Sequence, residues 1–198
     1  MLRQFCLQTA LGLILFSGAA AAQSTEHLRG TVDLLFGDIL EMTTRSGEKL
    51  SVSLDDTTRV VAVVRAQLAD IKPGTGVGIA WVPQPDGTPR ALEVTILPPS
   101  QPVKPSTAPW DLTPSSRMTN GTVGAVTGST ARTLTVNDGK AEQTIIVPPS
   151  APVVAFAPSN RDLLAPEAPI VVFAHKEKDG TLSAGAIAVG KDGATPPM

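Results

Sequence analysis

An internal repeat constrains the fold of this chain more than any other feature of its sequence. Residues 29–32 (Arg-Gly-Thr-Val) recur as residues 120–123 (Asn-Gly-Thr-Val), at an offset of 91. Further along, Asp-Ile-Lys-Pro at 70–73 corresponds to Leu-Leu-Ala-Pro at 163–166, and Asp-Gly-Thr at 86–88 recurs at 179–181. The matches keep their order, and the offset drifts only from 91 to 93. The sequence therefore predicts two copies of one domain, over residues 27–98 and 118–191.

Each copy has the alternation of apolar and polar residues that is typical of β-strands. In the first copy Leu50, Val52 and Leu54 alternate with polar side chains, and similar patterns indicate further strands. The expected order is three strands with an extension, then one or two helical turns over residues 65–71, then two strands. This is the element order of an OB-fold, a five-stranded partly open barrel; an SH3-like barrel is the main alternative. The predicted fold class is all-β, with tandem duplicated small OB-like barrels that each carry one short helix.

The two copies are separated by a proline-rich linker over residues 99–117. Proline fixes φ and lacks an amide donor, so we expect this segment to join neither sheet nor helix and to run extended. Trp110 and Leu112 are expected to pack against a barrel rather than to stand free as a ligand platform. Residues 192–198 are predicted to form a disordered tail.

The first 22 residues are typical of a signal peptide. Arg3 precedes a largely apolar stretch over residues 5–16, and small residues end at Ala22, after which cleavage is expected. The apolar stretch is short for an uncleaved membrane anchor, which is the alternative. Cys6 precedes that stretch, so it cannot be the lipid-bearing cysteine of a lipoprotein, and no cysteine remains after cleavage. We expect an exported periplasmic protein that does not span a membrane.

Charge argues against one class of partner. The residues after the predicted cleavage point carry 15 Lys and Arg against 18 Asp and Glu, a net charge of −3. Proteins that hold nucleic acid need a basic face for the phosphates. The sequence therefore predicts no nucleic-acid partner.

No residue pattern indicates a catalytic, cofactor or metal site, and the ligand-binding residues are unknown at this stage. The two histidines, His27 and His175, do not occupy equivalent positions in the copies and are expected at the surface. Asp55-Asp56 with Glu48 is interpreted as turn residues rather than a calcium site. Trp81 is expected to pack in a barrel rather than to stack on a base.

The Asp-Gly pairs at 86–87 and 179–180 are interpreted as type I′ hairpin turns, in which both central residues need a positive φ. The sequence contains no Gly-x-Ser-x-Gly nucleophile elbow and no phosphate-binding loop. The chain is therefore predicted not to be an enzyme and to use no cofactor.

At this point the motifs resemble a known group. The copy-one motifs, with residues 68–74 (Leu-Ala-Asp-Ile-Lys-Pro-Gly) and 86–88, look like a bacterial envelope domain of unknown function with an OB-like fold. The chain is similar to proteobacterial exported proteins that share residues 109–114 (Pro-Trp-Asp-Leu-Thr-Pro) and a tail ending in Pro-Pro-Met. Members often carry the label "metal ABC transporter permease". A permease needs several membrane-spanning helices, and the sequence after residue 22 offers none.

Three hypotheses for the function follow. The first is a non-catalytic binding or scaffolding module whose two barrels contact an unknown protein, glycan or small ligand; two linked sites raise avidity. The alternative is a soluble accessory to metal uptake or homeostasis in the cell envelope. The third is an enzyme acting on envelope polymers, for which the residues give no positive indication.

Overall fold

The protein is all-β in the computed structural model, which describes residues 25–127 and 132–196. The predicted signal peptide, residues 1–22, lies outside the described residues. The first repeat contains β1 (Thr25–Phe36), β2 (Ile39–Thr44), β3 (Lys49–Ser53), β4 (Arg59–Arg65), the 3-10 turn η1 (Leu68–Asp70), β5 (Gly76–Pro83) and β6 (Pro89–Ile96). The remainder contains β7 (Ser106–Pro109), β8 (Arg117–Thr127), β9 (Thr133–Asn137), β10 (Glu142–Ile146), β11 (Val153–Pro158), η2 (Arg161–Leu163), β12 (Pro169–Lys176) and β13 (Leu182–Gly190).

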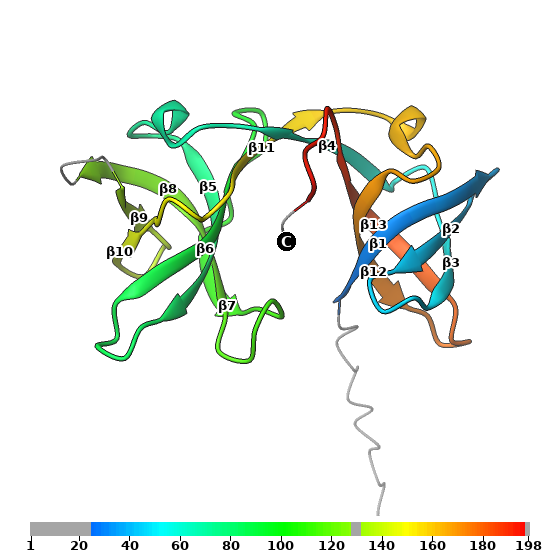
Figure 1. Cartoon of the computed structure of the whole chain (residues 1–198), viewed down its shortest axis with the longest axis horizontal. Coiled ribbons are helices and arrows are strands. Elements are labelled where there is room, and N and C mark those ends of the chain that lie inside the picture. The colour runs from blue at the N-terminus through cyan, green and yellow to red at the C-terminus, as the bar shows by residue number, and fades with distance from the viewer. Residues whose placement is uncertain (1–24, 128–131, 197–198) are drawn as a thin grey trace, which may run out of the picture.

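The strands pair into two closed five-stranded rings. In ring A the neighbours run β1, β2, β3, β13, β12 and back to β1, and the pairing of β3 with β13 is parallel. In ring B they run β8, β9, β10, β6, β5 and back to β8, and the pairing of β10 with β6 is parallel. The rings form the two lobes in Figure 1, with ring B on the left and ring A on the right.

Each ring takes strands from both repeats. Ring A combines β1–β3 of the first repeat with β12 and β13 of the second, and ring B combines β8–β10 of the second with β5 and β6 of the first. The boundaries predicted from sequence, one barrel within 27–98 and one within 118–191, differ from this arrangement. The element order of β1–β6 recurs over β8–β13, and the last two strands of each series pair into the ring of the other.

The segments that cross between the rings explain the exchange. β4 reads Arg-Val-Val-Ala-Val-Val-Arg and contains no Gly, Pro, Asn or Asp that would turn the chain back toward β3. Seven residues of extended chain span about 23 Å, enough to carry the backbone from one ring to the other. β11 makes the opposite crossing, and the two segments lie side by side at the top of Figure 1.

β4 and β11 pair with each other around a local two-fold axis. Val63 faces Phe156, and the repeat offset of 93 makes these two residues each other's counterparts. Val61 and Val154 are likewise counterparts, and they pair with the ends of the opposite strand, Pro158 and Arg65. Such self-complementary pairing is what two equivalent segments form about a two-fold axis. β4 also pairs with β13 and β11 with β6, so the bridge is hydrogen-bonded into both rings.

Aliphatic side chains fill both rings, as the low aromatic content predicts. In each ring the residues that alternate inward are almost completely removed from solvent, which contributes about 1.5–3 kcal/mol for each large side chain. The buried members in ring A include Val32, Leu40, Met42, Val52, Val172 and Ile187, and those in ring B include Val77, Ile79, Val94, Leu134, Val136 and Ile145.

Two local expectations need correction. Each predicted helix over one or two turns is a single 3-10 turn, η1 or η2. The hairpin at Asp86-Gly87 is not type I′, because Gly87 has a φ of 83° while Asp86 has no positive φ. Instead, residues 85–87 form a three-residue loop in which Gln84 N–H donates to the Thr88 carbonyl and the Asp86 carboxylate accepts from Thr88 N–H.

The linker and the tail are more ordered than expected. Residues 106–109 of the predicted linker form β7, which pairs antiparallel with β8 despite its terminal proline. This pairing is compatible with proline because β7 is an edge strand, where a missing donor faces away from the ladder. The tail predicted to be disordered over 192–198 is placed as far as residue 196, and Ala194 and Pro196 in it are buried. It lies between the rings in Figure 1.

The exchange predicts how half of the chain behaves. A chain cut to residues 25–97 keeps β1–β6 but lacks the strands that close β1–β3, so we expect no folded monomer. Mixing it with residues 98–196 should restore the β-sheet signal in circular dichroism and give a one-to-one complex in light scattering. A folded monomer of the first half alone would contradict the exchange.

Candidate functional site

The polar residues of greatest interest lie between the rings, on the outer face of β6. Val94 points into the core of ring B, so its neighbours Glu93 and Thr95 point outward. Both are nearly inaccessible to solvent, each 1% exposed. Around them, Ala80 and Met118 on the outer face of ring B pack with Phe173 of ring A. Ala80 is the residue that faces Glu93 across the β5–β6 ladder. A carboxyl group thus sits in a largely apolar layer between two rings.

β1 and the linker supply a hydrogen-bonded cluster at the same junction. Arg29 forms a bidentate pair with Asp111, with N–O distances of 2.8 and 2.9 Å. His27 Nδ1 lies 3.1 Å from the same carboxylate, and its ring packs against Trp110 at 4.3 Å between centroids and edge-on to Phe173 at 5.1 Å. This cluster fixes the linker segment after β7 against ring A.

Several buried polar atoms between the rings have no hydrogen-bond partner in the described part of the chain. They are both carboxyl oxygens of Glu93, the Thr95 hydroxyl, Trp110 Nε1, His175 Nδ1 and Arg29 Nε. An unsatisfied buried polar group costs about 1–3 kcal/mol, so folded proteins usually avoid such groups. Their concentration at one junction makes this junction the candidate for a binding site.

The carboxyl groups of the junction differ in charge. Burial raises the pKa of Glu93 to about 8, although the charges of Arg29 and Arg45 act in the opposite direction. Glu93 is therefore mostly neutral at pH 7. Partial burial alone would raise the pKa of Asp111, but the hydrogen bonds and charge of Arg29, together with His27, outweigh it and lower the pKa. The junction thus holds one ionised and one protonated carboxyl.

Two grooves open on this junction. The one that we call the linker groove has a volume of about 490 Å³ and is lined by both Thr95 and Trp110, with Lys104 and Asn120 among its polar residues. The second, of about 370 Å³, is lined by His175 and lies against β13. Gln101, Phe156 and Phe173 line both grooves. Thr95 and Trp110, whose hydroxyl and indole N–H are buried without a partner in the described part of the chain, are therefore both residues of the linker groove, which also has aromatic and aliphatic walls.

Comparison of the two repeats shows that these polar residues are not needed for the fold. At the offset of 93, the counterparts of Glu93 and Thr95 are Ala186 and Ala188, which have the same outward placement on β13. The strand pairings agree, since Glu93 faces Ala80 and Ala186 faces Phe173, the counterpart of Ala80. Ring A closes with alanine at both positions, so the same topology does not require a carboxyl or a hydroxyl there.

The structure corrects the expectation for the histidines. His27 and His175 were predicted at the surface, but the His27 side chain is only 15% exposed, and His175 has a buried ring nitrogen that lines a groove. His175 lines the second groove, whereas His27 is not among the residues that line either groove, and the described part of the chain records no contact between the two histidines. Among residues 25–127 and 132–196, no group of three or more His, Cys, Asp or Glu side chains is placed to hold a metal ion.

Other assignments from sequence are confirmed. Trp81 is a core residue of ring B, 7% exposed, and its indole N–H donates to the Thr119 hydroxyl at 2.9 Å. Trp110 packs between the rings as expected. Asp55 is a turn residue whose carboxylate accepts from Thr57 and Thr58, and these hydrogen bonds lower its pKa.

Sequence reasoning missed Glu93 and Thr95, although a signal was present. Position 93 is the only acidic residue of β6, and its counterpart in the second repeat is alanine. A charged residue on a strand is expected to face solvent when only one face of the sheet is buried. Here both faces are buried, because the outer face of β6 looks toward the other ring.

Comparison of the chain with protein-family models, with curated proteins and with solved structures gave no match. In the described part of the chain, no helix has the length and apolar character needed to cross a membrane.

The raised pKa of Glu93 predicts a pH-dependent stability that Glu93→Gln removes. The native state holds this proton more tightly than the unfolded chain, so its contribution to the free energy of unfolding falls as pH rises from 4.5 to 8. We expect the difference in stability between E93Q and the native protein to grow with pH, at up to about 1.4 kcal/mol per unit. Urea denaturation at several pH values measures it; a constant difference between the two proteins would contradict the buried neutral carboxyl.

Proposed function

We propose that this protein is a non-catalytic binding module of the periplasm, built from two OB-like barrels, and that its ligand occupies the linker groove. Export rests on the signal-peptide features of residues 1–22. The barrel assignment is supported by strand order: counted across the exchange, each ring runs first, second, third, fifth, fourth, with a parallel pair between third and fifth.

The observation that carries the proposal is that two residues of the linker groove, Thr95 and Trp110, have buried polar groups without a partner among the described residues. Trp110 Nε1 can only donate a hydrogen bond, and the Thr95 hydroxyl can donate one and accept others. A bound molecule that supplies both partners recovers the desolvation cost which the folded protein otherwise carries. Binding sites are usually concave and mostly apolar, with a few fixed polar groups, and this groove has that composition.

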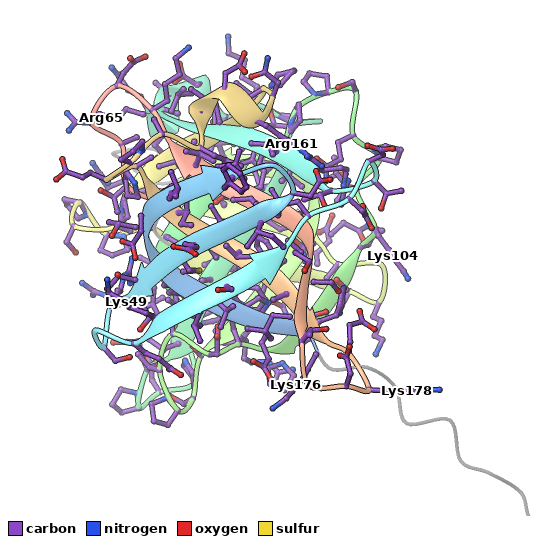
Figure 2. The ribbon with its side chains drawn as sticks, turned by 90° about the vertical axis from the view of Figure 1, so that its right-hand side faces the viewer. Lys49, Arg65, Lys104, Arg161, Lys176 and Lys178 are labelled. Carbon is purple, nitrogen blue, oxygen red and sulfur yellow. The ribbon has the colours of Figure 1, made fainter. Side chains whose placement is uncertain are left out.

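The groove favours an uncharged ligand that carries carbonyl and hydroxyl groups on a compact apolar frame. Phe156 and Phe173 offer apolar faces, and Gln101 and Asn120 add amide groups at its rim. Among the described residues that line the groove, Lys104 alone is charged, and its exposed side chain points outward from the molecule (Figure 2). Short N-acetylated oligosaccharides combine the required groups: an acetamido carbonyl for the indole N–H, hydroxyls for Thr95 and carbon–hydrogen faces for the phenylalanines.

The proposal predicts the effect of two conservative substitutions. Thr95→Val and Trp110→Phe each remove one hydrogen-bonding group and keep most of the shape. We expect each to weaken the binding of N-acetylglucosamine oligomers by about five- to tenfold, as the loss of one hydrogen bond implies, and T95V to leave thermal stability unchanged or raised. Titration calorimetry measures the affinity.

Thr122→Val is the matched control, since Thr122 is an exposed threonine on β8 away from the groove. It should leave binding unchanged. Absence of any binding by the native protein at millimolar oligosaccharide would refute the ligand class. Equal affinities for the native protein, T95V and W110F would refute the site.

A further inference from the structure

The two rings differ at one edge, and the difference is defined by the protein's own repeat. In ring B, the first residues of β8 pair with β5 on one side and with β7 on the other. In ring A, the corresponding residues of β1, Thr25–Arg29, pair only with β12, and β2 begins to pair at Gly30. Among the described residues, no strand lies beside Thr25–Arg29 on the β2 side.

The equivalence of these two edges follows from the strand register. Thr119 of β8 faces Ile79 of β5, while Leu28 of β1 faces Val172 of β12. The offsets of 91 for the first pair of strands and 93 for the second make these the same positions in the two rings. β7 therefore shows where an additional strand lies on this fold and in which direction it runs, antiparallel to the first strand of the ring.

β7 is held on ring B by polar contacts. The Thr107 hydroxyl donates to Asp138 at 2.8 Å and lies 2.9 Å from the Thr119 hydroxyl. Thr119 in turn donates to Gln143 and is completely buried. Pro105, just before β7, packs over the hairpin turn at Gly139. Because β7 is engaged in this way, it is not free to dock on the ring A edge of a second copy.

At the ring A edge, the corresponding side chains are apolar. The residue of ring A that corresponds to Thr119 is Leu28, and the residue that corresponds to Gln143 is Leu50. Trp81 corresponds to Ala174. Both leucines pack against the core of ring A but remain only partly buried, whereas Thr119 beneath β7 has no exposed surface. The edge in ring A is thus shaped for a strand whose central side chain is apolar instead of a threonine.

We propose that Thr25–Arg29 of β1 is a docking edge for an extended segment of another protein, which adds to ring A antiparallel to β1 as β7 adds to ring B. The residue opposite Leu28 in that segment is apolar. Main-chain hydrogen bonds along an open sheet edge supply affinity in such strand addition, and alternate side chains supply specificity. The His27 carbonyl now accepts from Arg29 Nη1 at 3.2 Å, and the Arg29 carbonyl accepts from Arg45 N–H at 2.9 Å. The incoming strand replaces the first contact, while Arg29 keeps its pair with Asp111 and its carbonyl keeps Arg45.

The probe for this edge is a capped peptide with the sequence of residues 104–109 that carries Thr107→Leu, added to the ¹⁵N-labelled protein after signal removal. We expect amide shifts in residues 25–29 and slowed hydrogen exchange at His27 N–H. The peptide with Thr107→Asp is the matched control and should bind at least tenfold more weakly. Shifts confined to the linker groove, or no shifts at 5 mM peptide, would overturn the proposal.

The variant Leu28→Thr separates specificity from stability. It copies the ring B residue, and we expect it to weaken the leucine peptide at least fivefold while binding the unaltered threonine peptide as well or better. A thermal unfolding curve of L28T shows whether the variant is folded, and so distinguishes weaker binding caused by unfolding from weaker binding caused by the changed edge. An unchanged preference for the leucine peptide in folded L28T would show that the strand does not lie opposite residue 28. Thr95 of the linker groove has no recorded contact with Thr25–Arg29 in the described part of the chain, so T95V should bind the peptide like the native protein.

Discussion

The antiparallel pairing of β4 with β11 is the interaction on which the rest of the molecule depends. Each segment leaves one ring and enters the other, so the pair carries the last two strands of each repeat to the opposite ring and joins the rings through β6 and β13. At its centre Val63, opposite the partly buried Phe156, is buried against the outer face of ring A through Val171 and Ala188. Without this bridge, the last two strands of each repeat would not reach the ring that they complete. The protein is therefore one cooperative unit although its sequence reads as two domains.

In this arrangement, outward-facing residues of the strands are buried between the two rings. In a single five-stranded ring, the residues on the outer side of β6 would be solvated, and a glutamate there would be ordinary. Because the bridge brings ring A opposite, Glu93 loses its water, its pKa rises to about 8, and its oxygens stay unpartnered. The linker then closes one side of the junction through the pairing of Asp111 with Arg29. The candidate site is thus a product of the exchange.

The strand pattern of each repeat was predictable because alternation reports directly on inward and outward faces, and the alternation of Leu50 and Val52 falls on β3. The exchange was not predictable from that pattern. A ring closed within one repeat and a ring closed across two repeats bury the same side chains, Val52 and Val189 among them, with the same period. These two alternatives differ only in the path of residues 59–65. The sequence shows that this segment lacks turn residues, but this is equally compatible with an extension of the third strand within one barrel. The linker was misjudged since proline excludes central strands but not an edge strand such as β7.

Duplication followed by divergence accounts for where the chemistry lies. Positions that both repeats keep apolar build the cores, and two groups of positions where the repeats differ bear on the proposed sites. Glu93 and Thr95 correspond to alanines in the second repeat and lie at the junction, while Thr119 and Gln143 correspond to leucines in the first repeat and lie where β7 docks. Both rings have the same strand order and the same kind of aliphatic core, so the needs of the core do not explain these differences. Polar residues of ring B hold the linker strand β7, whereas the same edge of ring A is apolar and has no such strand among the described residues, which is the asymmetry that the proposed docking of a strand on ring A requires.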